Sequence, residues 1–322
     1  MTGPVLIDAR IVRRREVAKG ICAFEIEAES GAVLPPFEAG AHIDVHAGGF
    51  VRQYSLHDGP SPAPSRYRIA VLRSPASRGG SEAMHALLHE GSALQISAPR
   101  NHFPLRPDTE FSVLMAGGIG ITPIMSMASA LHAKGSRFVL HYCARSRDHM
   151  AFGDELLRSP FADAVRLHAD DAPQSTFDAA RALAYPPPGA RLYVCGPQGF
   201  MDHVLRTAQA AGWDAQRLHH EAFQAAAVAA PGGNRAFELL AVRSGKRTRV
   251  GADETALQAL VRCGVPIASS CEQGVCGSCL TPVLEGEVDH RDTFLTAEEQ
   301  ARHDQFLPCC SRALGDRLAV DV

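Results

Sequence analysis

The 322-residue chain has little lysine, little net charge and no long unbroken apolar stretch. Lysine occurs 3 times against 29 arginines, and the formal net charge is −3. So small a charge creates no global field that attracts nucleic acid or an anionic lipid surface, and we expect neither partner. Arginine binds phosphate well, but a GC-rich genome produces the same excess, and we favour that explanation for most of the arginines.

Targeting segments are also missing from the sequence. The most apolar window, residues 113–133, is interrupted by three glycines and a proline, which is too broken for a membrane span. Residues 1–15 contain no apolar core of a secretory signal. We therefore expect a cytoplasmic protein without structural disulfides, in which the clustered members of its 9 cysteines serve metal binding or catalysis.

The character of the chain changes along its length, which predicts three domains. Residues 1–107 contain short strand-like runs between glycine and proline clusters, as in a β-barrel or sandwich. Residues 108–224 alternate strand-like and helix-like segments, which indicates a parallel α/β sheet. Residues 225–233 (AAAVAAPGG) have the composition of a linker, and residues 234–322 form the third predicted domain.

Four cysteines near the C-terminus have the spacing of a plant-type [2Fe–2S] site. They follow the pattern Cys-x4-Cys-x2-Cys and then, after 29 further residues, Cys. Structural zinc is the alternative, but zinc sites usually combine two Cys or Cys/His pairs, whereas here one loop carries three cysteines. The predicted ligands are Cys271, Cys276, Cys279 and Cys309.

The residues around these cysteines support the cluster and leave one question open. Gly274 and Gly277 allow the loop backbone to take positive φ angles and approach the inorganic sulfides closely. Cys309 is followed directly by Cys310, and in an extended segment only one of the two would face the cluster.

Two segments of the first third have the chemistry of a flavin site. One offers a guanidinium for phosphate, an aromatic ring for the flavin ring and a hydroxyl for flavin N5, in the sequence Arg52-Gln53-Tyr54-Ser55. The other places amides and a hydroxyl before a predicted helix at residues 82–89, as in an anion pocket: Gly79, Gly80 and Ser81. Each pattern alone also fits a solvated strand or a surface turn.

Two segments of the middle third have features of a nucleotide site. The turn at residues 116–123 lacks the Gly-x-Gly-x-x-Gly fingerprint, but its glycines still bring backbone amides at a helix N-terminus close to a pyrophosphate. A second segment, Cys195-Gly196-Pro197, ends the last apolar run, at the edge where doubly wound sheets bind ligands. Taken separately, a structural turn and a core cysteine explain these two segments.

In this order, the motifs resemble those of the phthalate dioxygenase reductase family, part of the ferredoxin–NADP reductase superfamily. The resemblance covers essentially the whole chain. It implies an antiparallel β-barrel flavin domain, a doubly wound parallel α/β NAD domain and a β-grasp plant-type ferredoxin domain. It also implies FMN instead of FAD, because of the position of the phosphate pocket.

The resemblance assigns roles to individual residues. The flavin residues would be Arg52, Gln53, Tyr54 and Ser55, with Ala70, Val71 and Leu72 at the ring edge and Gly79, Gly80 and Ser81 at the phosphate. The nicotinamide nucleotide would meet Gly117, Gly118, Gly120, Thr122, Arg145, Cys195, Gly196 and Pro197. The expected catalytic residues are Ser55, Cys195 and Phe223, where Phe223 covers the flavin ring unless it is a core aromatic.

In the ferredoxin part, the family motif Cys-x-Ser-Arg-Ala makes Cys309 the fourth ligand. Cys310 departs from the aliphatic residue that is common there, and a packed free thiol is the simplest interpretation of it.

The implied function is an electron relay. NADH, with NADPH as an alternative, would give hydride to FMN, and single electrons would pass through the [2Fe–2S] cluster. The expected acceptor is an oxygenase, either a Rieske-type aromatic-ring dioxygenase or an O-demethylase, with a haem-thiolate monooxygenase as the alternative. A redox-sensing module without turnover would need no flavin or nicotinamide motifs. We expect a monomer.

Overall fold

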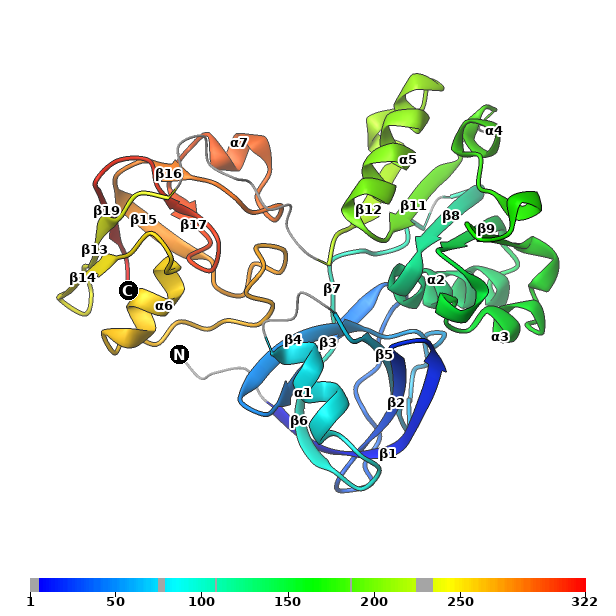
Figure 1. Ribbon diagram of the computed structural model, residues 1–322, viewed down its shortest axis with the longest axis horizontal. Helices are drawn as coiled ribbons and strands as arrows, with labels where there is room; N and C mark the ends of the chain where they lie inside the picture. Colours follow the sequence, from blue (N-terminus) through cyan, green and yellow to red (C-terminus); the bar gives the residue numbers. More distant parts are fainter. Residues whose placement is uncertain (1–5, 75–78, 108, 186, 224–233) are drawn as a thin grey trace. The chain divides into compact units, whose positions relative to one another are not determined.

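The computed structural model describes residues 6–74, 79–107, 109–185, 187–223 and 234–322. The chain divides into two compact units, Met1–Glu221 and Ala222–Val322 (Figure 1). The first unit contains two separate sheets and the second contains a third sheet. The linker predicted at residues 225–233 lies outside the described residues, and the three domain boundaries remain predictions.

An antiparallel β-barrel forms the N-terminal part of the first unit. Its main sheet has the order β4-β3-β6-β1-β2-β5, and β7 pairs with β3. The edge strands meet through a bridge between Leu56 and Ile69, and the His57 amide donates to the Arg68 carbonyl at 3.1 Å, which closes the barrel. The elements are β1 (Leu6–Ala18), β2 (Ile21–Ala28), β3 (Ala41–Ala47), β4 (Phe50–Ser55), β5 (Tyr67–Leu72), α1 (Gly80–Leu87), β6 (Ala93–Ser97) and β7 (Arg100–Asn101).

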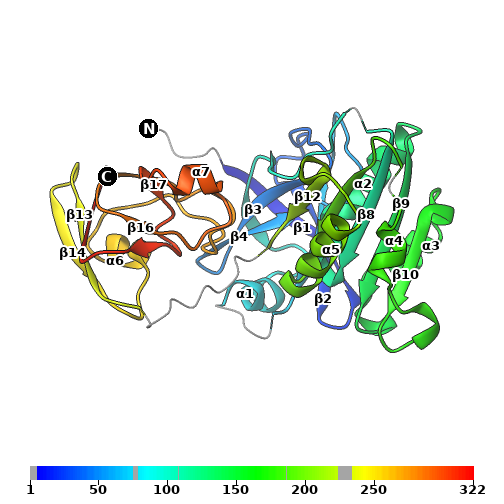
Figure 2. The same ribbon diagram turned by 90° about the horizontal axis from the view of Figure 1, so that it is seen from above.

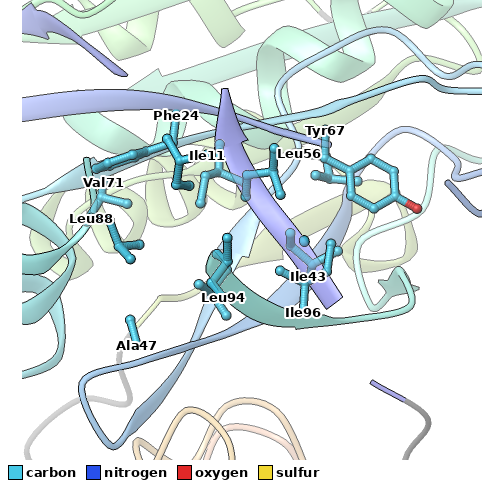
Figure 3. Close-up of a cluster of buried hydrophobic side chains, with 14 of the residues drawn as sticks. Ile11, Phe24, Ile43, Ala47, Leu56, Tyr67, Val71, Leu88, Leu94 and Ile96 are labelled. Carbon is cyan, nitrogen blue, oxygen red and sulfur yellow. The ribbon is translucent and has the colours of Figure 1, made fainter. Parts of the chain in front are cut away.

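Alternation along the strands fills the barrel with apolar side chains. In β2 every second residue is buried, which is the two-residue period of a strand with one face on the core. Figure 3 shows Ile11, Phe24, Ile43, Leu56 and Tyr67 gathered in the interior, and all five are fully buried. Each such side chain contributes about 1.5–3 kcal/mol on burial.

Within the described residues, a five-stranded parallel sheet with its connecting helices forms the rest of the first unit. Its order is β10-β9-β8-β11-β12, so the direction of winding reverses between β8 and β11. Ligands of such sheets bind at the carboxyl ends of the strands beside this reversal. The strands are β8 (Phe111–Gly117), β9 (Arg137–Ala144), β10 (Val165–Ala169), β11 (Arg191–Cys195) and β12 (Leu218–Glu221).

Helices connect these strands, as the doubly wound pattern requires (Figure 1). The α-helices are α2 (Ile121–Ala133), α3 (Gly153–Leu157), α4 (Ala179–Leu183) and α5 (Gln198–Ala210). The 3-10 helices are η1 (Gly118–Gly120), η2 (Arg147–His149), η3 (Ala162–Ala164), η4 (Pro173–Ser175) and η5 (Ala215–Arg217).

The second unit is a mixed sheet with a helix packed on it (Figure 2). The sheet has the order β14-β13-β19-β15-β17, in which β13 and β19 are parallel, and β16 pairs separately with β18. Helix α6 begins with a capping box of Thr255 and Gln258. The elements are β13 (Phe237–Ala241), β14 (Lys246–Val250), α6 (Ala256–Arg262), β15 (Thr281–Glu285), β16 (Val288–Asp289), α7 (Ala297–Gln300), β17 (Gln305–Phe306), β18 (Arg312–Ala313) and β19 (Arg317–Val320).

The observed sheets confirm the predicted combination of an antiparallel barrel, a parallel α/β sheet and a β-grasp sheet. Among the described residues, none of the helices has both the length and the apolar character that crossing a membrane would need.

Arg312 ties together three segments of the second unit. The side chain is only 5% exposed and donates to the carbonyls of Glu254 at 2.7 Å, Gly251 at 2.8 Å and Arg235 at 2.9 Å. Its guanidinium also lies over the Phe237 ring, 5.2 Å from the ring centre.

We predict that Arg312→Ala lowers the free energy of unfolding of the second unit by about 3 kcal/mol, because three carbonyls lose their donor. Urea unfolding of the full chain followed by circular dichroism measures this change. Arg317→Ala is the matched control, since Arg317 is exposed and its ion pair with Glu285 is long at 3.7 Å, so a change below about 0.5 kcal/mol is expected. Equal losses in both variants would contradict the prediction.

Candidate functional site

The N-terminus of α1 and the side of β4 form an anion-binding corner in the barrel. Gly79 has φ 94°, and a Cβ at this position would lie 2.5 Å from the Phe50 ring. A Cβ on Gly80 would lie 2.5 Å from Nε of Arg52. Only glycine therefore lets the helix begin this close to the Arg52 guanidinium. A helix N-terminus beside a guanidinium fits a phosphate group, as predicted for FMN.

Other side chains define this corner further. The Arg52 guanidinium stacks on the Phe50 ring at 5.4 Å, a contact that the sequence analysis missed because phenylalanine carries no phosphate chemistry of its own. The Ser81 hydroxyl accepts a hydrogen bond from the Ser74 amide at 3.2 Å.

The remaining predicted flavin residues lie on β4 and β5. Gln53 hydrogen-bonds His42 at 3.2 Å, and the partly buried Tyr54 packs on the barrel core, where burial raises the pKa of its hydroxyl. Of the predicted ring-edge residues, Ala70 and Val71 are buried, whereas Leu72 is 38% exposed.

Three polar side chains meet where the barrel adjoins the parallel sheet. Ser55 ends β4, Cys195 ends β11, and Glu221 ends β12 directly opposite Cys195. The Ser55 hydroxyl hydrogen-bonds the Glu221 carboxyl. Nothing local in the sequence pairs Glu221 with Ser55, because the two residues belong to distant segments of the chain.

The pKa values of Glu221 and Cys195 indicate that this group of side chains carries no charge at neutral pH. Burial raises the pKa of Glu221 to about 8, an effect that the Ser55 hydroxyl partly opposes. Burial, followed by the charge of Glu221, raises the pKa of the Cys195 thiol, so Cys195 is a neutral contact and not a nucleophile. Glu221 as a whole is partly exposed, but its Oε2 atom is buried and has no hydrogen-bond partner among the described residues. Such an atom fits a polar group of a bound cofactor.

The two predicted nucleotide segments touch at the point where the winding of the parallel sheet reverses. A Cβ on Gly120 would lie 2.3 Å from the Cys195 carbonyl oxygen, and one on Gly196 would lie 2.9 Å from the Gly117 Cα. Gly118, with φ 54°, has open space around its Cβ position. The turn therefore presents bare backbone at the strand ends, which fits a dinucleotide.

The other predicted nucleotide residues have these places. Thr122 is 2% exposed and its hydroxyl donates to the Ile119 carbonyl at 3.1 Å, so it closes the turn. Pro197 directly precedes α5. Arg145 is exposed just after β9. Phe223 lies in the second unit, and its predicted role at the flavin remains a prediction.

In the second unit, the four predicted cluster cysteines are buried in two pairs. The thiols of Cys271 and Cys276 hydrogen-bond each other, and so do those of Cys279 and Cys309. Within the first pair, the contact lowers the pKa of Cys276 and raises that of Cys271, as for two thiols that share one proton.

The two pairs fit a [2Fe–2S] cluster, in which each iron takes two thiolates and two bridging sulfides. A structural zinc would instead gather four side chains around one ion. Within the described part of the chain, no three His, Cys, Asp or Glu side chains surround a single ion position.

The loop that carries three of these cysteines is shaped by left-handed backbone. Glu272, Gly274 and Gly277 have φ angles of 53°, 73° and 69°. The amides of Gln273 and Ser278 donate to the sulfurs two residues earlier, at 3.3 and 3.4 Å. The backbone thus turns its donors toward the sulfurs, as a negatively charged cluster requires.

Cys309 and Cys310 have different partners in the structure, although their thiols also contact each other. Cys309 is 4% exposed and faces Cys279. The Cys310 sulfur lies 3.7 Å from the Leu307 carbonyl oxygen and 2.6 Å from where a Cβ on Gly274 would be. This geometry favours Cys309 as the fourth ligand.

These features define a modular electron-transfer reductase with a flavin barrel, a nucleotide sheet and an iron–sulfur unit. Residues 241–314 match the "2Fe-2S iron-sulfur cluster binding domain", and residues 96–218 match the "Dimethylamine monooxygenase subunit DmmA-like, N-terminal domain".

Full-length relatives agree with this class. The chain is 51% identical to the vanillate O-demethylase oxidoreductase of Pseudomonas sp. (strain HR199 / DSM 7063), over 98% of this chain and 100% of that protein. It is 39% identical to the heme-dependent oxidative N-demethylase beta subunit of Ectopseudomonas mendocina (strain ymp), over 98% and 99%. The solved structure of phthalate dioxygenase reductase matches with a TM-score of 0.80, 38% identity and 98% coverage of both chains.

The chain belongs to the phthalate dioxygenase reductase family. This confirms the predicted family, fold class and cofactors: FMN, a [2Fe–2S] cluster and a nicotinamide nucleotide. It also confirms an NAD(P)H-dependent electron-transfer oxidoreductase that serves an oxygenase.

We predict that Gly277→Ala lowers the iron and acid-labile sulfide bound per chain by more than half. A Cβ there would lie 2.3 Å from the Phe294 ring in addition to requiring φ 69°, so the cluster loop must move. Gly315→Ala, whose added Cβ would lie in open space, should leave both contents unchanged. Full cluster content in Gly277→Ala would overturn this account of the loop.

We predict that Glu221→Gln stabilises the first unit increasingly as the pH rises. The raised pKa of about 8 means that the folded wild type keeps a proton that the unfolded chain loses above about pH 4.5. The Glu221 contribution to stability therefore falls between pH 4.5 and 8. Urea unfolding at pH 5, 6.5 and 8.5 should show a gain for the variant that grows to about 1–3 kcal/mol. A gain independent of pH would contradict the raised pKa.

Proposed function

We propose that this chain supplies electrons to a Rieske-type oxygenase that acts on methoxylated aromatic compounds by O-demethylation. The observation that carries the proposal is 51% identity, without truncation of either chain, to a vanillate O-demethylase oxidoreductase. Each cofactor position expected for this relay has matching residues in the structure: the Arg52 corner, the glycine turn at the strand ends and the paired thiols.

FMN accepts two electrons as hydride and releases them singly, and the [2Fe–2S] cluster carries one electron at a time. The residues of the chain bind and orient these groups. Arg52 and the α1 N-terminus would hold the flavin phosphate, and the backbone of Gly117–Gly120 would bind the pyrophosphate of the nucleotide. The two thiol pairs would hold the cluster.

Ser55, Cys195 and Glu221 would contact the reacting rings. With a pKa of about 8, Glu221 keeps a proton on its carboxyl at neutral pH, and the Ser55 hydroxyl holds that carboxyl in place. Glu221 Oε2 therefore offers a hydrogen bond to a bound ring without adding a negative charge, while the neutral Cys195 thiol provides packing.

The coenzyme we propose is NADH. Arg145 lies exposed after β9, where the adenosine ribose of a bound nucleotide would be, and this one arginine supports NADPH as a secondary coenzyme. We also propose that the protein is a cytoplasmic monomer.

A haem enzyme is the second candidate for the acceptor. It is favoured by the 39% identity to a heme-dependent oxidative N-demethylase beta subunit over nearly the whole of both chains.

The partner is tested by combining the purified chain with the oxygenase component of a Rieske O-demethylase, NADH and a methoxylated benzoate. Formaldehyde release that depends on the chain supports the proposal. Electron transfer to a haem oxygenase but not to the Rieske component would favour the second candidate.

We predict that Cys271→Ser abolishes reduction of cytochrome c, by about 100-fold or more, but changes ferricyanide reduction by NADH less than about threefold. Ferricyanide accepts electrons from reduced flavin, whereas the one-electron path needs the cluster. Cys263→Ser is the matched control, because the Cys263 thiol bonds the Leu260 carbonyl and lies outside the thiol pairs. Equal loss of both activities in Cys271→Ser would contradict the order flavin, then cluster.

A further inference from the structure

A buried carboxylate lies directly beneath the cluster loop. The Asp292 side chain is fully buried, and a Cβ on Gly274 would be 3.2 Å from the Asp292 Cα and 3.3 Å from its Cβ. The Thr293 amide donates to the Gly274 carbonyl at 3.0 Å, which fixes the segment against the loop. No motif in the sequence indicated this aspartate, because it lies 13 or more positions from each predicted ligand.

Three hydrogen bonds hold the carboxyl group of Asp292 in place. Its Oδ2 atom accepts from the Leu295 amide at 2.9 Å, and its Oδ1 atom accepts from the Ser311 hydroxyl at 3.2 Å and from His290 Nδ1 at 3.4 Å. Ser311 stands two residues after Cys309, so the carboxylate is linked to the ligand segment as well as to the loop.

Arginine does not neutralise this charge among the described contacts. The Arg291 guanidinium bonds Asp289 at 2.6 and 2.8 Å and Asn234 at 2.7 Å. Arg312 donates to backbone carbonyls. The neighbouring polar side chain is His290, which is 6% exposed and has no partner for Nε2 among the described residues.

The segment that carries the fourth ligand lies close to this carboxyl group. The Asp292 Oδ1 atom accepts a hydrogen bond from the Ser311 hydroxyl at 3.2 Å, and the Cys310 sulfur lies 3.7 Å from the same hydroxyl. A negative charge this close to the cluster ligands opposes the arrival of an electron there.

We propose that Asp292 is the fixed charge that lowers the reduction potential of the [2Fe–2S] cluster, with His290 and Ser311 positioning its carboxylate. The proposal rests on the presence of the cluster but not on the identity of the oxygenase. Cluster potentials depend on nearby charge, on hydrogen bonds to sulfur and on solvent exposure. A low potential makes the reduced cluster a stronger donor to the next acceptor.

The test is the midpoint potential of the cluster in Asp292→Asn, measured by dye-mediated titration of the full chain with dithionite and followed by electron paramagnetic resonance. We expect the reduced form to be favoured about tenfold over wild type, a rise of about 59 mV for one electron. Asp289→Asn is the matched control, because it removes the same charge from a part-exposed aspartate that is paired with Arg291. No rise in Asp292→Asn, or an equal rise in both variants, would overturn the proposal.

If Asp292→Asn assembles no cluster, as judged from its iron and sulfide content, a second pair of variants decides. Thr293 is exposed and adjacent to Asp292, so Thr293→Lys should raise the potential at low ionic strength and Thr293→Glu should lower it. Identical potentials in these two variants would contradict control by charge in this segment. None of these titrations uses NADH or an oxygenase. Their outcome therefore does not depend on whether the proposed oxygenase is the electron acceptor.

Discussion

All three cofactor positions depend on one constraint, the close contact between the backbone of a glycine and neighbouring protein atoms. The flavin corner requires Gly80 beside Arg52, the nucleotide turn requires Gly120 against the Cys195 carbonyl, and the cluster loop requires Gly277 against Phe294. An added Cβ would collide with the Arg52 side chain at the first place, with backbone at the second and with a ring at the third. The proposed contacts to a phosphate, a pyrophosphate and a set of sulfurs would all depend on this one property of glycine.

Buried polar groups provide the second common feature. The Ser55–Glu221 pair lies where two differently built sheets adjoin, and Asp292 lies under the iron–sulfur loop. Each carboxyl is held by hydrogen bonds: Glu221, on which burial keeps a proton, contacts the Ser55 hydroxyl, and Asp292 accepts from three donors.

Local sequence patterns predicted the parts of this structure that depend on neighbouring residues. The spacing of Cys271, Cys276 and Cys279 predicted the cluster loop, and alternating strands and helices predicted the parallel sheet. The helix expected at residues 82–89 begins two residues earlier, at Gly80, because the glycines that were expected to form a separate turn already belong to its first turn.

Contacts between distant segments could not be predicted in this way. Ser55 and Glu221 are brought together only by closure of the barrel against the sheet, and Asp292 reaches Ser311 across the fold of the second unit. Phe50 was missed for another reason, since its part is to support Arg52 and not to bind a ligand.

The position of Arg312 has a consequence for how the protein is made in the cell. This side chain joins three backbone segments of the second unit, and it is three residues from Cys309, which faces Cys279 in the loop. Insertion of iron and consolidation of the hydrophobic core are therefore thermodynamically linked, because each restricts the same short stretch of chain. Newly synthesised protein in iron-starved cells is expected to be more susceptible to proteolysis in this unit than in the barrel.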